Sequence, residues 1–414
     1  MKVLLRTYGC RANQYDTEAV RGMLANAGVE EANDAVEADF VVFNSCTVTA
    51  AAEADLRSGV RALARANPSV RTVVMGCAAG LPDRDERVAP LATLPTVEAV
   101  IPGADLGAIA MALGVRLSAF SAAPQRQQAT ARALLRIQDG CDEHCTFCAT
   151  TIARGPNRSR SVDDLLAEAQ DLALSHPEIV ITGIHIGTYG RDIESSLSEL
   201  VETLVENVPV VRFRLSSVEA TEVDDRLADL LTSDSSRVAP HLHAPLQSGS
   251  DSVLRRMGRH WYDSTRYEAA LRRLTDSNPV FGLSADVITG FPGETEEDHG
   301  ATVRLVARLP FTSLHVFPWS PRPGTAAVRL TDRVADAVSR RRAGELRSIS
   351  TEKAASYAAA RAGGSCDVVV TERGKGITED YLSVSIADRT IPRRSRFGAL
   401  LHNIEGELTA LPHD

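Results

Sequence analysis

Three cysteines within eight residues constrain this chain more than any other feature. Cys141, Cys145 and Cys148 follow directly after the largely apolar run Ala133 to Ile137. Three thiolates on one short loop can hold an iron–sulfur cluster, and a [4Fe-4S] cluster bound by only three protein sulfurs leaves one iron open to another ligand. Structural zinc usually takes four nitrogen or sulfur ligands in two separated pairs. Because His144 would complete a zinc set, zinc and ordinary structural cysteines are the alternatives.

Length and composition describe a globular chain of several domains. With 414 residues, 44% hydrophobic and 24% charged, the chain is long enough for two or three separate cores. The net charge of -9 argues against nucleic-acid binding through bulk positive potential, although a local basic patch is compatible with it. No apolar run approaches the roughly 18 residues that a bilayer span requires, and the N-terminus lacks the layout of a signal peptide. We therefore expect a cytoplasmic protein without a membrane segment.

The first hundred residues alternate between strand and helix patterns. We expect strands at 2–7, 40–43, 72–75 and 97–101 and helices at 16–27 and 50–66. Such alternation predicts an open parallel α/β sheet.

A second set of three cysteines falls in this region, and each follows one of the expected strands. Cys10, Cys46 and Cys77 are spaced 36 and 31 residues apart. The carboxyl ends of parallel strands share one edge of a sheet, so these sulfurs can converge despite their separation in sequence. Gly9 and Gly76 suit loops that bring the backbone close to a bulky group. The alternative is that small apolar cysteines simply pack at strand ends. An odd total of seven cysteines without an export signal favours metal or redox chemistry over disulfides, and the lone Cys366 is expected in an ordinary core.

A Ser-, Ala-, Pro- and Gln-rich stretch at 118–130 reads as a linker, and a second alternation of strands and helices begins after it. We expect six strands at 134–138, 179–183, 211–216, 241–245, 283–289 and 314–318. Intervening helices include 162–173 and 195–206. This order predicts a curved parallel sheet or partial barrel whose functional residues lie at the C-terminal ends of the strands.

Polar and glycine-rich sequences follow these strands and predict a ligand site. Glycine lets a ligand approach the backbone, while neutral polar groups suit a ribose or an amino-acid group. The candidate cofactor-binding residues are Gly183, Ser216, Ser217, Glu219, Gln247 and Asp286. We expect structural roles rather than metal binding for the isolated histidines, which are His185, His241, His243 and His315. The alternative for each segment alone is that its polar residues and glycines simply form a turn.

The cysteine loop has the CxxxCxxC form of the radical S-adenosylmethionine enzymes, and the chain resembles their methylthiotransferase branch over nearly its whole length. The further matching segments are Tyr8-Gly9-Cys10-Arg11-Ala12-Asn13-Gln14-Tyr15, Asn44-Ser45-Cys46-Thr47-Val48-Thr49, Gly76-Cys77, His243-Ala244-Pro245-Leu246-Gln247-Ser248-Gly249-Ser250 and Thr289-Gly290-Phe291-Pro292-Gly293-Glu294-Thr295. One departure is the segment 149–155, where family members often have a proline.

The resemblance implies an enzyme with two [4Fe-4S] clusters that uses S-adenosylmethionine twice, as methyl donor and as radical source. It implies that Cys141, Cys145 and Cys148 hold the radical cluster, whose fourth iron binds the cofactor. It also implies that Cys10, Cys46 and Cys77 hold an auxiliary cluster that carries the sulfur. An external electron donor is implied as well. An unactivated C–H bond has no useful acidity, so a cofactor radical is needed to open it.

Within this family the substrate is a modified adenosine at position 37 of tRNA, in the anticodon stem-loop, or a ribosomal protein side chain. The segments 11–15 and 46–49 resemble the threonylcarbamoyladenosine branch more than the isopentenyladenosine branch. Both other family substrates stay open, as does a non-catalytic RNA-binding protein with structural zinc. We expect a monomer.

The C-terminal part reads as a long helix at 333–362 followed by short strands at 367–371, 381–385 and 407–411, with Gly374 and Gly376 in a turn. This small all-β module resembles the RNA-binding TRAM domain. Two arginine clusters are candidate phosphate contacts, with solvated charge as the alternative. Their members are Arg154, Arg158 and Arg160, then Arg393, Arg394 and Arg396. The expected domains are an N-terminal domain at 1–117, the barrel at 131–348 and the TRAM-like module at 349–414.

Overall fold

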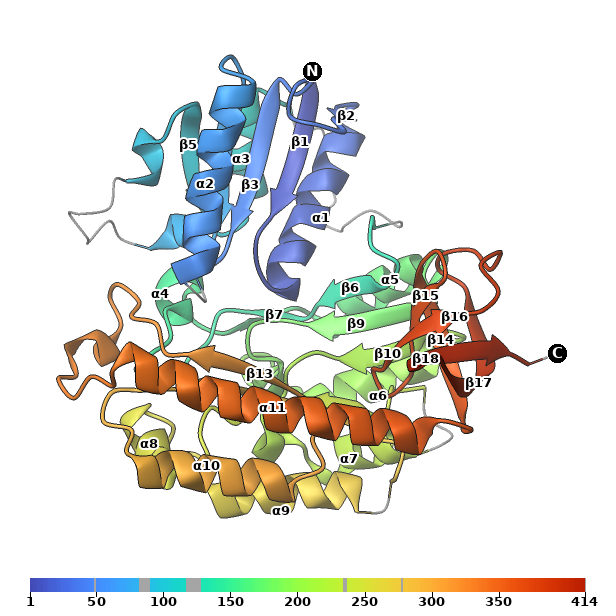
Figure 1. Ribbon diagram of the computed structural model, residues 1–414. Helices are drawn as coiled ribbons and strands as arrows, with labels where there is room; N and C mark the ends of the chain where they lie inside the picture. Colours follow the sequence, from blue (N-terminus) through green and yellow to red (C-terminus); the bar gives the residue numbers. More distant parts are fainter. Residues whose placement is uncertain (48–49, 82–89, 117–127, 234–236, 277, 414) are drawn as a thin grey trace. The chain divides into compact units, whose positions relative to one another are not determined.

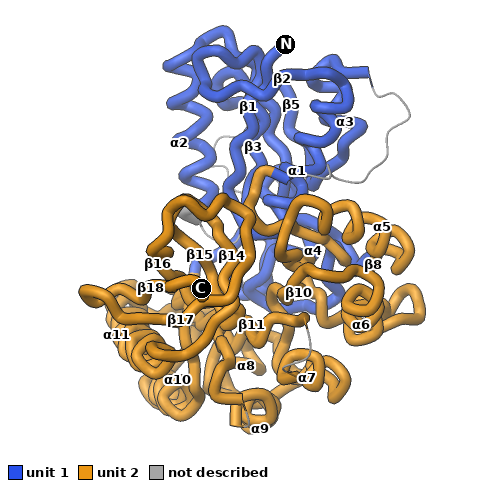
Figure 2. The backbone as a smooth tube through the Cα atoms, turned by 90° about the vertical axis from the view of Figure 1, so that its right-hand side faces the viewer, with its two compact units in different colours: residues 1–128, 138–158, 320–329 blue, residues 129–137, 159–319, 330–414 orange. Residues whose placement is uncertain are grey.

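The computed structural model describes residues 1–47, 50–81, 90–116, 128–233, 237–276 and 278–413. They form two compact units that do not follow the order of the chain (Figure 2). Unit 1 comprises residues 1–128, 138–158 and 320–329, and unit 2 comprises residues 129–137, 159–319 and 330–414. The cysteine loop therefore belongs to the same unit as the N-terminal sheet. Most of the expected linker, residues 117–127, lies outside the described residues.

Unit 1 is built on the expected parallel sheet. Its strands are β1 (Lys2–Thr7), β2 (Glu30–Glu31), β3 (Phe40–Ser45), β4 (Arg71–Gly76) and β5 (Val97–Pro102), in the order β2-β1-β3-β4-β5. All neighbours are parallel. Three longer helices cover the sheet: α1 (Arg11–Asn26), α2 (Ala50–Ala66) and α3 (Leu106–Leu113).

The alternation of side chains along these strands gives the sheet two apolar faces. Val41 and Val74 pack with Leu56 and Val60 of α2 on one face. Val42, on the opposite face, belongs to the core that α1 and α3 cover (Figure 1). Because both faces are buried, the edge at the C-terminal ends of the strands is where polar groups can gather.

Shorter elements complete unit 1 and lead out of it. They are the 3-10 turns η1 (Ala78–Gly80), η2 (Leu91–Thr93) and η5 (Ala326–Arg329), the strands β7 (Gln138–Asp139) and β8 (Arg158–Ser159), and the helix α4 (Thr150–Arg154). Within the segment 149–155, residues 150–154 form this helix of five residues.

Unit 2 contains the expected partial barrel. Its six strands are β6 (Ala133–Arg136), β9 (Glu178–Thr182), β10 (Arg212–Leu215), β11 (His241–His243), β12 (Gly282–Thr289) and β13 (Ser313–Pro318). They form two parallel sheets, β10-β9-β6 and β11-β12-β13. Parallel bridges from Phe213 to Val238 and from Ser217 to His243 join these sheets between β10 and β11. The strand positions expected from sequence are confirmed to within a few residues.

Helices cover the outside of this barrel, and a single large apolar core fills the space between them and the strands. They are α5 (Val162–Ala173), α6 (Leu197–Asn207), α7 (Asp225–Thr232), α8 (Asp251–Arg256), α9 (Ser264–Thr275), α10 (Glu296–Arg308) and α11 (Asp336–Arg361), with 3-10 turns η3 (Ile186–Thr188) and η4 (Ala220–Glu222). The long helix α11 runs beside β13 (Figure 1). No helix in the described parts of the chain has the length and apolar character of a membrane span.

The C-terminal module is a closed five-stranded barrel, as the resemblance implied. Its strands are β14 (Ser365–Glu372), β15 (Lys375–Ile377), β16 (Ser383–Ile386), β17 (Arg396–Ile404) and β18 (Glu407–Pro412), in the order β14-β15-β16-β18-β17. Cys366 lies in its core, as expected. One expectation was wrong, because Gly376 belongs to β15 rather than to a turn, and the sequence analysis did not identify β15 or β17. Only one face of β17 is buried, which normally gives an alternating pattern, but the apolar residues Leu400 and Ile404 on its exposed face obscure that alternation.

A buried ionic cluster attaches this module to the partial barrel within unit 2. Glu178 is fully buried and accepts hydrogen bonds from Arg212 at 2.6 Å and Arg214 at 2.9 Å. Arg212 also pairs with Asp367 at 3.0 Å, and Arg214 donates to the carbonyl of Thr378 at 2.8 Å. Buried charges are tolerated only when paired and hydrogen-bonded, so these contacts fix the module against the strands.

Candidate active site

The second set of cysteines converges at one edge of the unit 1 sheet. Cys10 is the residue before α1, Cys46 follows β3 and Cys77 follows β4, and these loops leave the neighbouring strands β1, β3 and β4. Cys46 and Cys77 are buried, whereas Cys10 is exposed. All seven cysteines lie in the described ranges, and each is a thiol rather than half of a disulfide. The expected convergence is therefore present in the fold.

Asn13 stands between these sulfurs. The Cys10 thiol donates to its Oδ1 at 3.3 Å, and its Nδ2 lies 3.9 Å from the sulfur of Cys77 and 2.9 Å from Asn44 Oδ1. A Cβ on Gly9, whose φ is +145°, would meet Asn13 Oδ1 at 2.6 Å and Cys46 Cβ at 3.1 Å. The expected close approach of the backbone at this glycine is confirmed, and Asn13 contacts sulfur as well as backbone.

Two buried arginines make this edge suitable for an anionic group. Burial raises the pKa of the Cys77 thiol to about 11, against the opposing effect of Arg154, whose Nε lies 3.1 Å from the sulfur. Burial lowers the pKa of Arg322, against the opposing charges of Glu53 and Cys46. The described residues give Arg322 Nε, which is buried, no hydrogen-bond partner. Three thiols with two buried cations suit an iron–sulfur cluster with thiolate ligands.

The first set of cysteines lies on a loop that the backbone holds closely. Cys148 N donates to Cys145 O at 3.1 Å, and Cys141 N donates to Gly155 O at 3.1 Å. A Cβ on Gly140, whose φ is +74°, would lie 1.9 Å from the carbonyl oxygen of Pro156. This crowding requires glycine immediately before the first cysteine.

His144 does not form a compact metal set with the loop cysteines. Within the part of the chain that the structure describes, His243, Asp286 and His315 alone form a group of His, Cys, Asp or Glu whose ligand atoms all lie within 4.8 Å of one another. The donor chemistry of the loop, three sulfurs on one turn, fits a cluster with one open iron better than tetrahedral zinc.

In unit 2, three of the candidate cofactor-binding residues gather around His243. The backbone of Ser217 forms a parallel β-bridge with that of His243. Asp286 Oδ2 lies 3.3 Å from His243 Nε2, and Gln247 N donates to Asp286 O at 2.8 Å. His315 Nδ1 approaches Asp286 Oδ1 at 3.2 Å. Burial alone would raise the pKa of Asp286, but hydrogen bonds from the two histidines lower it overall, so the carboxylate is ionised. The sequence indicated isolated histidines, but His243 and His315 both contact Asp286 from the strands on either side of β12.

The remaining candidate cofactor-binding residues lie at other strand ends. Gly183 follows β9, and buried Ser216 follows β10 and donates its N–H to Ile181 O at 2.9 Å. Glu219 forms a buried ion pair with Arg259, which makes it a structural anchor of this strand end. The other two histidines have structural contacts, as expected. His185 binds Glu222 at 3.0 Å, and His241 stacks on Tyr381 with ring centroids 4.5 Å apart.

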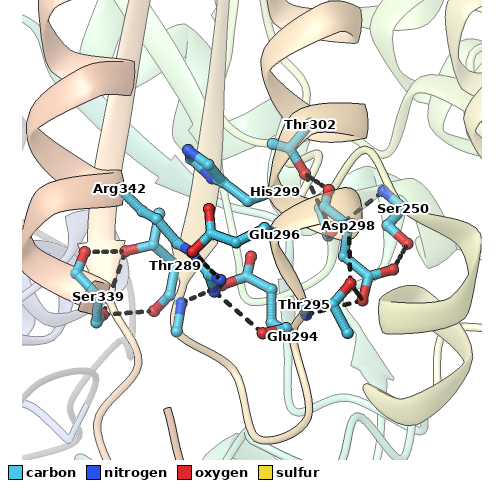
Figure 3. Close-up of polar contacts among 12 residues, drawn as sticks. Ser250, Thr289, Glu294, Thr295, Glu296, Asp298, His299, Thr302, Ser339 and Arg342 are labelled. Carbon is cyan, nitrogen blue, oxygen red and sulfur yellow. Dashed lines mark hydrogen bonds and ion pairs between the residues drawn. The ribbon is translucent and has the colours of Figure 1, made fainter. Parts of the chain in front are cut away.

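Sequence reasoning missed the buried pair that holds the loop after β12. Glu294 accepts from Gly290 N at 2.6 Å and from Arg342 of α11 at 2.7 Å, and both side chains are almost completely buried (Figure 3). On α10, Thr295 and Asp298 form a capping box (Figure 3). The Thr295-x-x-Asp298 spacing was a usable local signal. The Glu294 to Arg342 pair, separated by 48 residues, offered none.

Most arginines of the two clusters form ion pairs or hydrogen bonds within the protein, which is not expected of residues that bind phosphate. Arg154 is a correction, because its side chain is 1% exposed and paired with Asp16 and Asp139. Arg158 is 54% exposed, and Arg160 binds Glu168 at 2.7 Å. In the C-terminal module the other three bind backbone or carboxylate groups of unit 2. Their partners are Ala129 O for Arg393, Thr130 O for Arg394, and Asp367 with Val210 O for Arg396. Arg158 and Arg393 remain the accessible members.

Two family models match the chain. Residues 2–92 match an uncharacterised protein family, UPF0004, and residues 135–306 match the radical S-adenosylmethionine superfamily. The first range covers the loops of Cys10, Cys46 and Cys77, and the second covers the CxxxCxxC loop and most of the partial barrel.

Curated relatives cover most of the chain. It is 34% identical over 409 residues to the threonylcarbamoyladenosine tRNA methylthiotransferase MtaB of Bacillus subtilis, which covers 93% of this chain and 88% of the relative. It is 32% identical over 436 residues to the tRNA-2-methylthio-N(6)-dimethylallyladenosine synthase of Mycobacterium bovis, which covers 99% of this chain and 83% of the relative.

Among solved structures, the fold is similar to a radical S-adenosylmethionine methyltransferase, TsrM, from Kitasatospora setae, which has cobalamin and a [4Fe-4S] cluster bound. The TM-score is 0.52 at 16% identity, over 79% of this chain and 76% of that one. This likeness supports the fold alone. With the two cysteine sets and the curated relatives, the chain belongs to the radical S-adenosylmethionine methylthiotransferases, enzymes that use S-adenosylmethionine and iron–sulfur clusters.

Proposed function

We propose that this enzyme adds a methylthio group to C2 of N6-threonylcarbamoyladenosine at position 37 of tRNA, with two [4Fe-4S] clusters and two molecules of S-adenosylmethionine. The observation that carries the proposal is the presence of two separate three-thiol sites in unit 1. One site lies on a single loop, and the other is assembled from three loops at one sheet edge.

Cys141, Cys145 and Cys148 would hold the radical cluster, and Cys10, Cys46 and Cys77 would hold the auxiliary cluster. S-adenosylmethionine would supply the methyl group and, with the radical cluster, the power to remove hydrogen from an unactivated C–H bond, which acid–base catalysis by side chains cannot do; the auxiliary cluster would carry the sulfur atom. The remaining work belongs to the protein. Asn13 and the glycine-rich loops position the auxiliary sulfurs, and the polar strand ends of unit 2 orient ligand groups.

For S-adenosylmethionine we propose contacts with Gly183, Ser216, Ser217 and Gln247, which follow the barrel strands at the C-terminal ends where such ligands collect, and with Asp286 inside β12. Glu219 would act indirectly, through its buried pair with Arg259.

The threonylcarbamoyl branch is supported by the sequence of segments 11–15 and 46–49, and by the name of the relative from Bacillus subtilis. The dimethylallyl branch is the second candidate, because relatives with that name are 32% identical over a similar span.

We further propose Arg158 and Arg393 as phosphate contacts with tRNA, since their guanidinium groups reach solvent. The domain limits 1–117, 131–348 and 349–414, a monomeric state, an external electron donor and a cytoplasmic location complete the proposal.

Nucleoside mass spectrometry of tRNA from cells with and without the protein tests the substrate. We expect loss of the methylthio form of threonylcarbamoyladenosine. Loss of the methylthio form of the dimethylallyl nucleoside would instead assign the enzyme to the dimethylallyl branch. Unchanged tRNA nucleosides would exclude both substrates.

Iron and sulfide analysis after anaerobic purification tests the clusters. We expect about eight iron atoms per chain for two [4Fe-4S] clusters. Zinc without iron would contradict the proposal.

Cys148→Ala should abolish cleavage of S-adenosylmethionine, whereas Cys46→Ala should preserve cleavage and lose sulfur transfer. Sulfur transfer by the Cys46 variant would exclude the auxiliary role.

A further inference from the structure

Arg154 makes three charge-assisted contacts from a buried position in unit 1. Its Nε donates to the sulfur of Cys77 at 3.1 Å, and its two terminal nitrogens donate to Asp16 at 2.8 Å and to Asp139 at 3.1 Å. The side chain is 1% exposed, and that of Asp16 is fully buried. A guanidinium has no acceptor capacity, so its orientation is set by these three partners.

The position of Arg154 in the chain links the two cysteine sets. It is the last residue of α4, a helix that begins two residues after Cys148. A second contact joins the same elements: a Cβ on Gly80, at the end of the turn that follows Cys77, would lie 2.8 Å from the carbonyl oxygen of Ala153. The loop of Cys77 and the helix after Cys148 are therefore packed without room for a side chain between them.

Arg154 remains positively charged in this position. Burial alone would lower its pKa, but Asp16, Cys77 and Asp139 raise it overall, so the guanidinium stays ionised. A cation that donates a hydrogen bond to a cluster sulfur stabilises the reduced, more negative cluster. The potential of iron–sulfur clusters depends on net charge, on hydrogen bonds to the sulfurs and on solvent exposure. The neighbouring carboxylates partly offset the charge, but the hydrogen bond itself goes to the sulfur.

We propose that Arg154 is a positioning residue of the auxiliary site, which raises the reduction potential of that cluster through Cys77 and ties it to the helix that follows the radical-cluster cysteines. This inference rests on the proposed function, because it requires a cluster on Cys10, Cys46 and Cys77. It replaces the role of Arg154 in phosphate binding.

A redox titration of the full chain tests the inference. The parent protein carries Cys141→Ala, Cys145→Ala and Cys148→Ala, so that one cluster remains, and its potential is followed by the paramagnetic signal of the reduced state. We expect Arg154→Gln to shift the potential to more negative values and Arg154→Lys to restore part of the shift. Arg71→Gln is the matched control, because Arg71 also pairs with a carboxylate, Glu98 at 2.7 Å, but is 51% exposed and begins β4, at the opposite end of this strand from Cys77; it should leave the potential unchanged.

The outcomes separate this inference from the proposed function. A parent protein without about four iron atoms per chain would contradict the auxiliary cluster itself. A loaded parent whose potential is the same with Gln at position 154 would overturn the role of Arg154 alone. If Arg154→Gln does not load iron, Asp139→Asn provides the second measurement. Removing one of the carboxylates that offset the guanidinium should shift the potential to more positive values, and no shift would overturn the inference.

Discussion

The buried pair between Glu294 and Arg342 allows a quantitative prediction for the loop after β12. Arg342→Met keeps the length and apolar contacts of the side chain but leaves the Glu294 carboxylate buried without its cation. Loss of one partner of a buried pair costs about 3–5 kcal/mol. Glu294 keeps the hydrogen bond from Gly290 N at 2.6 Å, which places the expected loss of unfolding free energy near the lower limit, about 3 kcal/mol.

Urea unfolding followed by tryptophan fluorescence measures this loss. The two tryptophans of the chain, Trp261 and Trp319, both belong to unit 2, and Trp319 packs on Phe291 of the same loop with ring centroids 6.1 Å apart. With a slope of about 3 kcal/mol per molar urea, the midpoint should fall by about 1 M. Arg341→Met is the matched control, because Arg341 is the adjacent residue on α11 and binds exposed Glu296 at 2.7 Å. Its midpoint should move little, since exposed pairs contribute little.

The same pair gives a pH dependence. Burial raises the pKa of Glu294 above its ordinary value, against the opposing Gly290 N–H and Arg342. A raised carboxyl pKa means that stability is greatest below the unfolded value and is lost as pH rises through the folded value. Without Arg342 the pKa rises further, so the deficit of the Arg342→Met protein should be smaller at pH 5 than at pH 8. Equal deficits at both pH values, or equal losses for Arg341→Met and Arg342→Met, would refute the reasoning.

Three further predictions follow from single contacts. Gly140→Ala should reduce iron from about eight to about four atoms per chain, because its Cβ would lie 1.9 Å from Pro156 O beside the cysteine loop; unchanged iron would show that the loop adapts. Asp298, whose pKa burial alone would raise, is held below its ordinary range by hydrogen bonds from Ser250, Ser252 and Thr295, so its contribution to stability is present above the unfolded pKa and lost as pH falls through the folded one. Asp298→Asn should therefore flatten the acid side of a melting-temperature profile, and an unaltered profile would contradict this. Arg158→Ala and Arg393→Ala should each lower the salt dependence of tRNA binding by about one unit of slope, whereas an unchanged slope would place the phosphates elsewhere.

The sequence by itself determined the order of elements and the place of the cysteines. Strands β1, β3 and β4 show local apolar runs, and because parallel strands align their carboxyl ends, Cys10, Cys46 and Cys77 had to share one edge. The six barrel strands were recognisable for the same local reason.

Only the tertiary structure decided which polar side chains meet. Arg154 and Asp16 are 138 residues apart, and nothing in either local pattern distinguishes this buried pair from solvated charges. His243 and His315 read as isolated histidines until β11 and β13 were placed on either side of Asp286 in β12. Secondary structure follows from periodicity within a segment, whereas an ion pair depends on the register between segments. The first can be read along the chain, and the second exists only after the chain has folded.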